Sequence, residues 1–225
     1  MVKPIYSISP FTLLDFPDKV ACIFWFAGCN MRCPYCYNPE IVLGKGKKTW
    51  VDAVSFLNNR KGLLEGVVLS GGECTLHKKI VSYIEEIKDL GFTVKIDTNG
   101  SRPEILKELC ERKLIDYVAL DFKAMKNSYK KVTESNLYHR FESSLSLLLS
   151  SQTLFEVRTT VHSDLISKLD LLEMRNYLER KGYRGKYFIQ YFVEDTSTLG
   201  NLGKSKRHRG LEEFNNDAIQ ICVRN

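Results

Sequence analysis

The sequence lacks the features that place a protein in a membrane or outside the cell. No apolar run approaches the ~20 residues that a helix needs to span a bilayer. The first ten residues, MVKPIYSISP, do not show the basic, apolar and small-residue order of a secretory signal. These absences predict a cytoplasmic protein without a membrane partner.

The chain also lacks a strong charge imbalance. Its 33 Lys and Arg against 27 Asp and Glu give a net charge of +6, which is too mild to indicate a nucleic-acid partner. Part of the excess gathers in one late Gly/Ser-rich stretch, at Lys204, Lys206, Arg207 and Arg209. We interpret this stretch as a solvated loop, and the alternative is a surface that docks an acidic partner.

Internal repeats are missing too, and nothing resembles an interdomain linker before residue 195. The 225 residues, 44% of them hydrophobic, can fill a sizeable core. The sequence therefore predicts one domain over 1–195. A C-terminal extension over 196–225 would hold the basic loop and a short helix.

Short apolar runs rich in β-branched and aromatic residues alternate with helical patterns, which is typical of parallel β/α units. Strands are predicted at 20–26, 66–70, 92–97, 116–121, 153–161 and 187–192. Helices are predicted near 49–59, 77–90, 103–113, 137–150 and 164–181. Six strands with crossover helices favour the α/β class, as a partial (β/α)6 TIM-like barrel of parallel strands.

In such barrels the chemistry gathers at the carboxyl ends of the strands. Here polar or glycine-rich groups lie at that end of five successive strands. In chain order they are a cysteine-rich loop, GGE at 71–73, DTNG at 97–100, DFK at 121–123, and Arg158 within the fifth strand. This convergence predicts a site at one end of the barrel.

The cysteine-rich loop, GCNMRCPYC, holds Cys29, Cys33 and Cys36 in the spacing C-x-x-x-C-x-x-C. A disulfide framework is not expected, because the count of seven cysteines is odd and no secretion signal is evident. A structural zinc site takes four protein ligands, and an iron–sulfur cubane takes four thiolates. No cysteine or histidine nearby completes the set, so one metal position is left for a ligand other than protein.

GCNMRCPYC after the first strand, with SGGE after the second, resembles the radical S-adenosylmethionine (SAM) superfamily. The stretch FTLLDFPDKVACIFWFAGCNMRCPYCYNPEI resembles the start of glycyl-radical-enzyme activating proteins, above all those of anaerobic ribonucleoside-triphosphate reductase. KIDTNGSRPEILKEL, IDYVALDFKA and FEVRTTV continue the resemblance to about residue 192. The residues beyond that point are unmatched.

The resemblance implies that Cys29, Cys33 and Cys36 hold a [4Fe–4S] cluster whose fourth iron binds the amino and carboxylate groups of SAM. Reductive cleavage of SAM then yields methionine and a 5′-deoxyadenosyl radical. This radical would abstract a hydrogen atom from a glycine of a partner enzyme. The cysteines are accordingly the expected catalytic and metal-binding residues.

The resemblance also implies how SAM is bound. Gly71 and Gly72 would let the backbone approach the methionine moiety closely, and Glu73 would accept from its ammonium group. Tyr35 would contact the adenine.

Five further residues match family positions beside SAM. Asp97, Thr98 and Asp121 match positions that surround a monovalent cation in pyruvate formate-lyase activating enzymes. Lys123 and Arg158 match positions that meet the carboxylate and its surroundings. A structural alternative is open for Asp121 and Lys123, which lie on one side of a strand and can pair with each other.

Three residues depart from the family pattern. Cys74 stands where a proline usually follows GGE, and we interpret it as a tolerated substitution, with a ligand or redox role as the alternative. Tyr37 replaces a histidine common after the last cluster cysteine. Asp18 replaces a glycine in the turn before the first strand.

The short spacing from the cysteines to the second strand leaves no room for a ferredoxin-like insert. This favours a minimal activase of a glycyl radical enzyme, the anaerobic ribonucleotide reductase large chain, with electrons from a flavodoxin or ferredoxin. One alternative is a radical SAM enzyme acting on a small molecule such as a 7-deazaguanine precursor. It should fill the barrel mouth with polar side chains, and the last strand offers only Gln190. The other alternative is a non-catalytic iron–sulfur or zinc-binding module.

Overall fold

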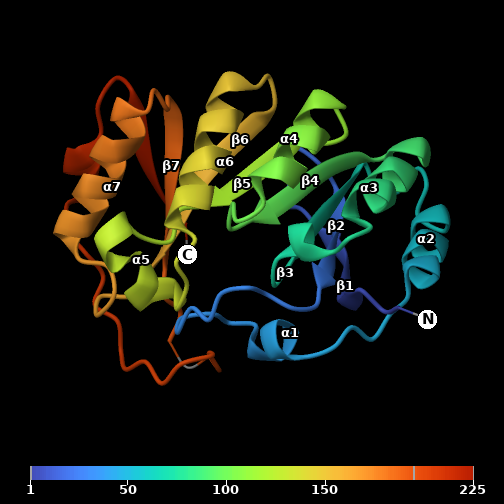
Figure 1. Cartoon of the computed structure of the whole chain (residues 1–225), viewed down its shortest axis with the longest axis horizontal. Coiled ribbons are helices and arrows are strands. Elements are labelled where there is room, and N and C mark those ends of the chain that lie inside the picture. The colour runs from blue at the N-terminus through green and yellow to red at the C-terminus, as the bar shows by residue number, and fades with distance from the viewer. Residues whose placement is uncertain (1, 195, 225) are drawn as a thin grey trace.

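The computed structural model describes residues 2–194 and 196–224 (Figure 1). A single eight-stranded sheet forms its centre, and the strands follow one another in chain order across the sheet. The strands are β1 (Ile5–Thr12), β2 (Ala21–Phe26), β3 (Gly66–Gly71), β4 (Thr93–Thr98), β5 (Tyr117–Asp121), β6 (Leu154–Val161), β7 (Gly185–Tyr191) and β8 (Ile219–Arg224). Strands β2 to β7 are parallel and confirm the six predicted strands.

Helices connect the parallel strands and follow one another in an arc along the sheet (Figure 1). They are α1 (Pro39–Leu43), α2 (Trp50–Asn58), α3 (Ile80–Asp89), α4 (Pro103–Glu111), α5 (Lys126–Thr133), α6 (Tyr138–Ser150) and α7 (Lys168–Arg180). The five predicted helices are confirmed, and α1 and α5 are additional. Within the described residues, no helix is long and apolar enough to cross a membrane.

Burial on one helix face explains why these segments fold as they do. In α3, Ile80, Ile84 and Ile87 are almost fully buried, at the spacing of a helix that packs one apolar stripe against a sheet. The central residues of β2 and β3 are apolar on both faces, as in sheets that are covered on both sides. The two layers thus hold the carboxyl ends of β2 to β6 at one end of a packed barrel.

Short-range sequence features explain the start of α2 and the turn before β2. Thr49 and Asp52 form the capping box that begins α2. Asp18 takes the left-handed conformation, with φ of 58°, which glycine adopts freely and aspartate tolerates better than most residues. The turn before β2 therefore keeps a glycine-like backbone in spite of the substitution.

The C-terminal segment contains more regular structure than its sequence indicates. The expected short helix is a 3-10 turn over Leu211–Phe214. The strand β8 that follows was not predicted, and it pairs in parallel with β7, from Gly185 beside Ile219 to Gln190 beside Arg224. These residues therefore continue the central sheet. The domain division at 195 stays a prediction.

Candidate functional site

A cavity of about 330 Å³ lies at the carboxyl ends of the parallel strands. It collects residues from the loop after β2 and from the ends of β3 to β6. Of the residues predicted for the site, those lining it are Cys29, Cys33, Tyr35, Cys36, Gly71, Gly72, Asp97, Thr98, Asp121, Lys123 and Arg158. Only Glu73 among the predicted set does not line the cavity.

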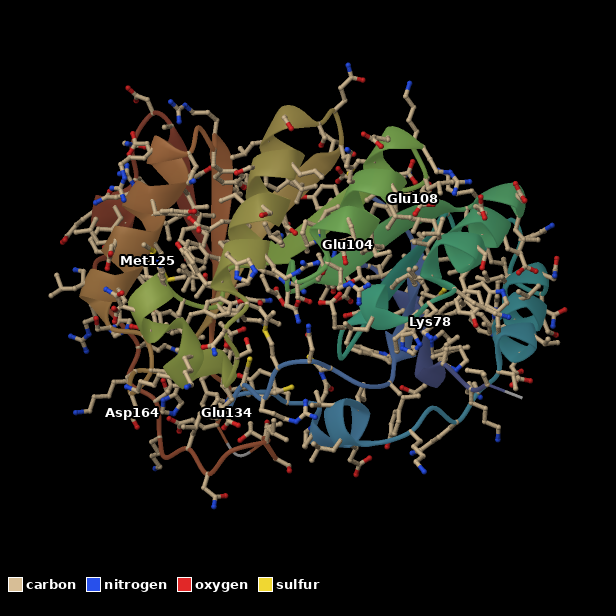
Figure 2. The ribbon with its side chains drawn as sticks, in the orientation of Figure 1. Lys78, Glu104, Glu108, Met125, Glu134 and Asp164 are labelled. Carbon is tan, nitrogen blue, oxygen red and sulfur yellow. The ribbon has the colours of Figure 1, made fainter. Side chains whose placement is uncertain are left out.

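The cysteine loop, residues 27–38, is held in its first half by backbone hydrogen bonds. The Gly28 amide donates to Ile41 at 2.8 Å, and the Arg32 amide donates to the carbonyl of Thr133, the last residue of α5, at 2.9 Å. Figure 2 labels Met125 and Glu134, which flank α5 at its two ends. The loop thus rests against the end of this short helix.

The three thiols are shielded to different degrees. Cys33 is buried, whereas Cys29 and Cys36 are half-buried. Burial raises the pKa of Cys29 to about 12, with Glu73 adding to the effect, and burial also raises the pKa of Cys33. The Met31 amide donates to Cys29 Sγ at 3.4 Å, and the Asn99 side-chain amide lies 3.9 Å from the same sulfur. Because thiolates are the form that binds metal, uptake of a metal by these cysteines would release protons.

The cysteines fit an iron–sulfur cluster better than a single ion. Among the described residues, no three His, Cys, Asp or Glu side chains converge closely enough to hold one metal ion. A tetrahedral zinc site needs such convergence. In a cubane each thiolate binds a different iron atom, and Cys29, Cys33 and Cys36 all line the one cavity.

The two glycines after β3 bring that strand end against the cysteine loop. A Cβ on Gly72 would lie 2.0 Å from the Gly28 carbonyl oxygen, and one on Gly71 would lie 2.4 Å from the backbone nitrogen and oxygen of Phe26. Gly71 also has φ of +118°, a conformation that other residues rarely adopt. Both positions therefore require glycine for chain packing, in addition to lining the cavity.

Glu73 is almost fully buried behind the cavity wall. Its Oε1 accepts from the Thr75 amide and hydroxyl and from the Thr98 hydroxyl, and its Oε2 accepts from the Asn99 amide at 2.7 Å. Burial nevertheless raises the pKa of this carboxyl. Glu73 therefore ties the β3 and β4 ends together, and its contact with a ligand ammonium group stays a prediction.

A buried charge network lies deeper in the cavity. Arg158 donates to Asp121 Oδ1 at 2.5 Å and approaches Asp97 Oδ2 at 3.2 Å. Lys95 lies 2.5 Å from Asp97 Oδ1, and Lys123 lies 2.9 Å from Asp121 Oδ2. Three cations face two carboxylates, so the network carries one positive charge in excess. A buried excess charge attracts an anionic group of a ligand.

Burial disfavours the ionised forms of Asp97 and Asp121, but their ion pairs together have the larger effect on the pKa of each carboxyl. Although burial raises the pKa of Asp97, Arg158 and Lys95 hold it at about 2. The pKa of Asp121 is likewise lowered by Arg158 and Lys123 against the effect of burial. Both carboxylates are therefore ionised and paired with cations. The sequence suggested only that Asp121 and Lys123 could pair with each other, whereas the structure also pairs Asp121 with Arg158 and Asp97 with Lys95. The monovalent cation expected beside them stays a prediction.

Tyr35 supplies an aromatic wall to the same cavity. Its hydroxyl is buried and, apart from the thiol of Cys33, no described group bonds it. The Lys123 ammonium lies 5.8 Å from the ring centre, within range of a cation–π contact. An aromatic face beside an excess positive charge suits a ligand with both a ring and a carboxylate.

Sequence reasoning missed several cavity residues. Lys95 is buried behind the cavity and pairs with the cavity residue Asp97; it precedes Asp97 by two positions and so shares its face of β4, a signal that could have revealed it. Arg224 also lines the cavity and donates to the buried Glu156 at 2.9 and 3.1 Å. Its guanidinium lies 3.4 Å from the Phe188 ring centre. No motif marks Arg224, because its place depends on the unpredicted pairing of β8.

Two of the substituted positions have structural explanations. Cys74 is fully buried away from the cavity, with its Sγ 3.7 Å from the Asp97 carbonyl oxygen. Burial raises the pKa of this thiol well above its usual value, as for a packed, unreactive cysteine. The Tyr37 hydroxyl accepts from the Val193 amide at 2.7 Å, and its ring stacks on Phe192.

The chain is similar to several known proteins. The family model of the radical SAM superfamily matches residues 23–162. A protein of Methanocaldococcus jannaschii named "Putative glycyl-radical enzyme activating enzyme" is 33% identical over 174 residues, covering 74% of this chain and 72% of the relative. The 7-carboxy-7-deazaguanine synthase of Aquifex aeolicus is 36% identical over 75 residues, covering 33% of each chain.

A solved structure supports the fold alone. Streptococcus suis SuiB bound to S-adenosylmethionine superposes with a TM-score of 0.65 at 15% identity. The match covers 90% of this chain and 52% of SuiB. The present chain thus spans about half of SuiB and a third of the deazaguanine synthase.

Proposed function

Because the chain belongs to the radical SAM superfamily, we propose that it activates a glycyl radical enzyme by abstracting a hydrogen atom from a glycine of that partner. The observation that carries the proposal is the arrangement of three cysteines and a buried, net-positive charge network around one cavity. A cluster on these cysteines with bound SAM would supply a 5′-deoxyadenosyl radical at this place.

Different residues of the cavity would bind the cluster and SAM. Cys29, Cys33 and Cys36 would hold the cluster. Lys123 and Arg158 would bind the SAM carboxylate, since both line the cavity and belong to the network with one positive charge in excess.

Two further groups would complete the binding of SAM. Tyr35 would face the adenine, and Glu73 would take the ammonium group through Oε2, which accepts only one protein hydrogen bond. Desolvation by the cavity walls would keep water from the radical.

The names of curated relatives support a glycyl radical enzyme as the partner. Curated relatives include glycyl-radical enzyme activating enzymes, and the partner we propose is the large chain of an anaerobic ribonucleoside-triphosphate reductase. Apart from Cys29, Cys33 and Cys36, the cysteines are dispersed along the chain. We therefore assign electron supply to a separate flavodoxin or ferredoxin.

The test is an anaerobic assay of the protein reconstituted with iron and sulfide and reduced with dithionite. We expect 5′-deoxyadenosine from SAM, and a glycyl-radical electron paramagnetic resonance (EPR) signal only when the reductase chain is present. SAM cleavage without a radical on the partner would retain the superfamily chemistry and reject the proposed substrate. No cleavage by a loaded cluster would reject both.

One observation favours a second candidate, an enzyme acting on a small molecule. Beyond the predicted Gln190, the cavity is lined by Asp15, Thr160 and Arg224, so its mouth is more polar than the sequence indicated. The match to a 7-carboxy-7-deazaguanine synthase points the same way for a third of the chain. Conversion of a deazaguanine precursor in the same assay, with no radical on the reductase chain, would establish this candidate.

A further inference from the structure

The segment over 196–210, here called the C-terminal strap, connects the cysteine loop to the far side of the barrel. In Figure 1 the strap runs below α5 and α7, where its hydrogen bonds join it to the cysteine loop. We interpret its sequence as a solvated basic loop, with a surface that docks an acidic partner as the alternative. In the structure, its backbone forms hydrogen bonds that connect it to the cysteine loop.

One side of the strap is anchored at the ends of β6 and β7. The Tyr191 hydroxyl donates to the His208 carbonyl at 2.7 Å, and His162 Nε2 lies 2.9 Å from the Gly203 carbonyl oxygen. The Ser163 amide donates to the Ser205 hydroxyl at 3.0 Å. Three bonds from buried or half-buried groups thus fix residues 203–208 to the barrel.

The other side of the strap bonds the cysteine loop. The Leu199 amide donates to the Cys36 carbonyl at 3.0 Å, and the Gly200 amide donates to the Pro34 carbonyl at 2.9 Å. These two carbonyls flank Tyr35. The first half of the loop is held by α5 and the SGGE turn, whereas its second half, which carries Cys36, is held by the strap.

The contact is close enough to demand glycine. A Cβ on Gly200 would lie 2.6 Å from Pro34 Cβ and 2.9 Å from Pro34 Cα, both parts of a rigid ring. Gly200 does not have a positive φ, so the requirement is for space alone. A Cβ on Gly203, three residues further along the strap, would meet no atom within 4 Å, which makes this position a matched control.

We propose that the C-terminal strap is a positioning element that holds Cys36 in place for the cluster, with Gly200 as its contact point. The proposal rests on the proposed function only in naming the cluster as what the loop binds. The amide of Val193, just before the strap, donates a hydrogen bond to the hydroxyl of Tyr37 and so also restrains the residue next to Cys36. The strap therefore limits how readily the loop releases metal.

The experiment compares the wild-type chain with Gly200→Ala and Gly203→Ala. In the metal-free proteins, hydrogen–deuterium exchange should become faster in peptides covering 33–38 and 196–202 for Gly200→Ala alone. After anaerobic reconstitution, loss of visible cluster absorbance to excess chelator should be roughly threefold to tenfold faster in Gly200→Ala, as the loss of one or two hydrogen bonds predicts. Tyr37→Phe, which keeps the ring and removes the acceptor, should show a smaller increase.

Three results would overturn the proposal. The first is an equal rate of hydrogen–deuterium exchange in all the proteins. The second is faster exchange in Gly200→Ala without faster loss of its cluster. The third is the same acceleration in Gly203→Ala as in Gly200→Ala. If no protein loads a cluster, the proposed function fails. The exchange data on the metal-free proteins would then still decide whether the strap holds the loop.

Discussion

Arg158 of β6 and Asp121 of β5 lie opposite each other in the sheet register and are joined by a hydrogen bond of 2.5 Å. The same guanidinium reaches Asp97 on β4, so one side chain links three neighbouring strands at the cavity. The planar guanidinium suits this role because it presents several N–H donors in fixed directions, so that it can contact two carboxylates at once. The network is thus both part of the fold and the place where positive charge is in excess.

Arg158→Lys should keep the charge but lose one of the two links. We expect SAM affinity of the reconstituted protein to fall roughly tenfold to a hundredfold, the range for weakening a charge-assisted contact by about 1.4 to 2.7 kcal/mol. Isothermal titration calorimetry measures this directly. Arg60→Lys, at an exposed position, should bind SAM like the wild type, and an unchanged affinity in Arg158→Lys would contradict the assigned role.

The low pKa of Asp97 predicts a dependence of stability on pH. Its folded pKa of about 2 lies below the unfolded value near 3.9, so its stabilising effect is present above about pH 4 and is lost as the pH falls toward 2. Between pH 6 and pH 3 the wild type should lose about 1 kcal/mol more unfolding free energy than Asp97→Asn. Urea unfolding at the two pH values tests this, and parallel losses in both proteins would refute it.

Cluster loading should depend on each cysteine of the loop and on no other. Cys33→Ala should retain little iron and sulfide after anaerobic reconstitution, because two thiolates hold a cubane poorly. Cys110→Ala, in α4 and outside the cavity at the strand ends, should load as the wild type does. Equal iron in Cys33→Ala and the wild type would show that the loop is not the cluster site.

The exposed cations of the strap predict a salt-sensitive interaction with an acidic partner. Among the described residues, Lys206 and Arg207 have no carboxylate within ion-pair distance, although Arg207 lies over the Tyr191 ring. Lys206→Glu combined with Arg207→Glu should weaken association with the partner, most strongly at low salt. Binding that is unchanged and insensitive to salt would exclude this surface.

Much of the barrel follows from the sequence because each strand carries its own signal. The alternation of apolar runs with helical patterns predicts β2 to β7, and the residues at their carboxyl ends meet in one cavity, as parallel strands require. The capping residues at Thr49 and the glycine-like turn at Asp18 obey local rules. Such features depend on neighbours within a few residues.

What sequence reasoning missed depends on partners far along the chain. Arg224 reaches the cavity only because β8 pairs with β7 and Glu156 is buried 68 positions earlier. The sequence does not indicate that the Glu73 carboxylate accepts hydrogen bonds from Thr98 and Asn99, 25 and 26 positions later. The strap's hold on Cys36 is made by backbone atoms, which carry no sequence signature.

The central claim is tested most directly by following the abstracted hydrogen atom. The reduced, reconstituted protein is incubated with SAM and a reductase chain whose glycines carry deuterium, and the 5′-deoxyadenosine is analysed by mass spectrometry. We predict one deuterium in the product, together with a glycyl-radical signal on the partner. Unlabelled 5′-deoxyadenosine with no radical on the partner would contradict the claim that a glycine of the reductase chain is the substrate.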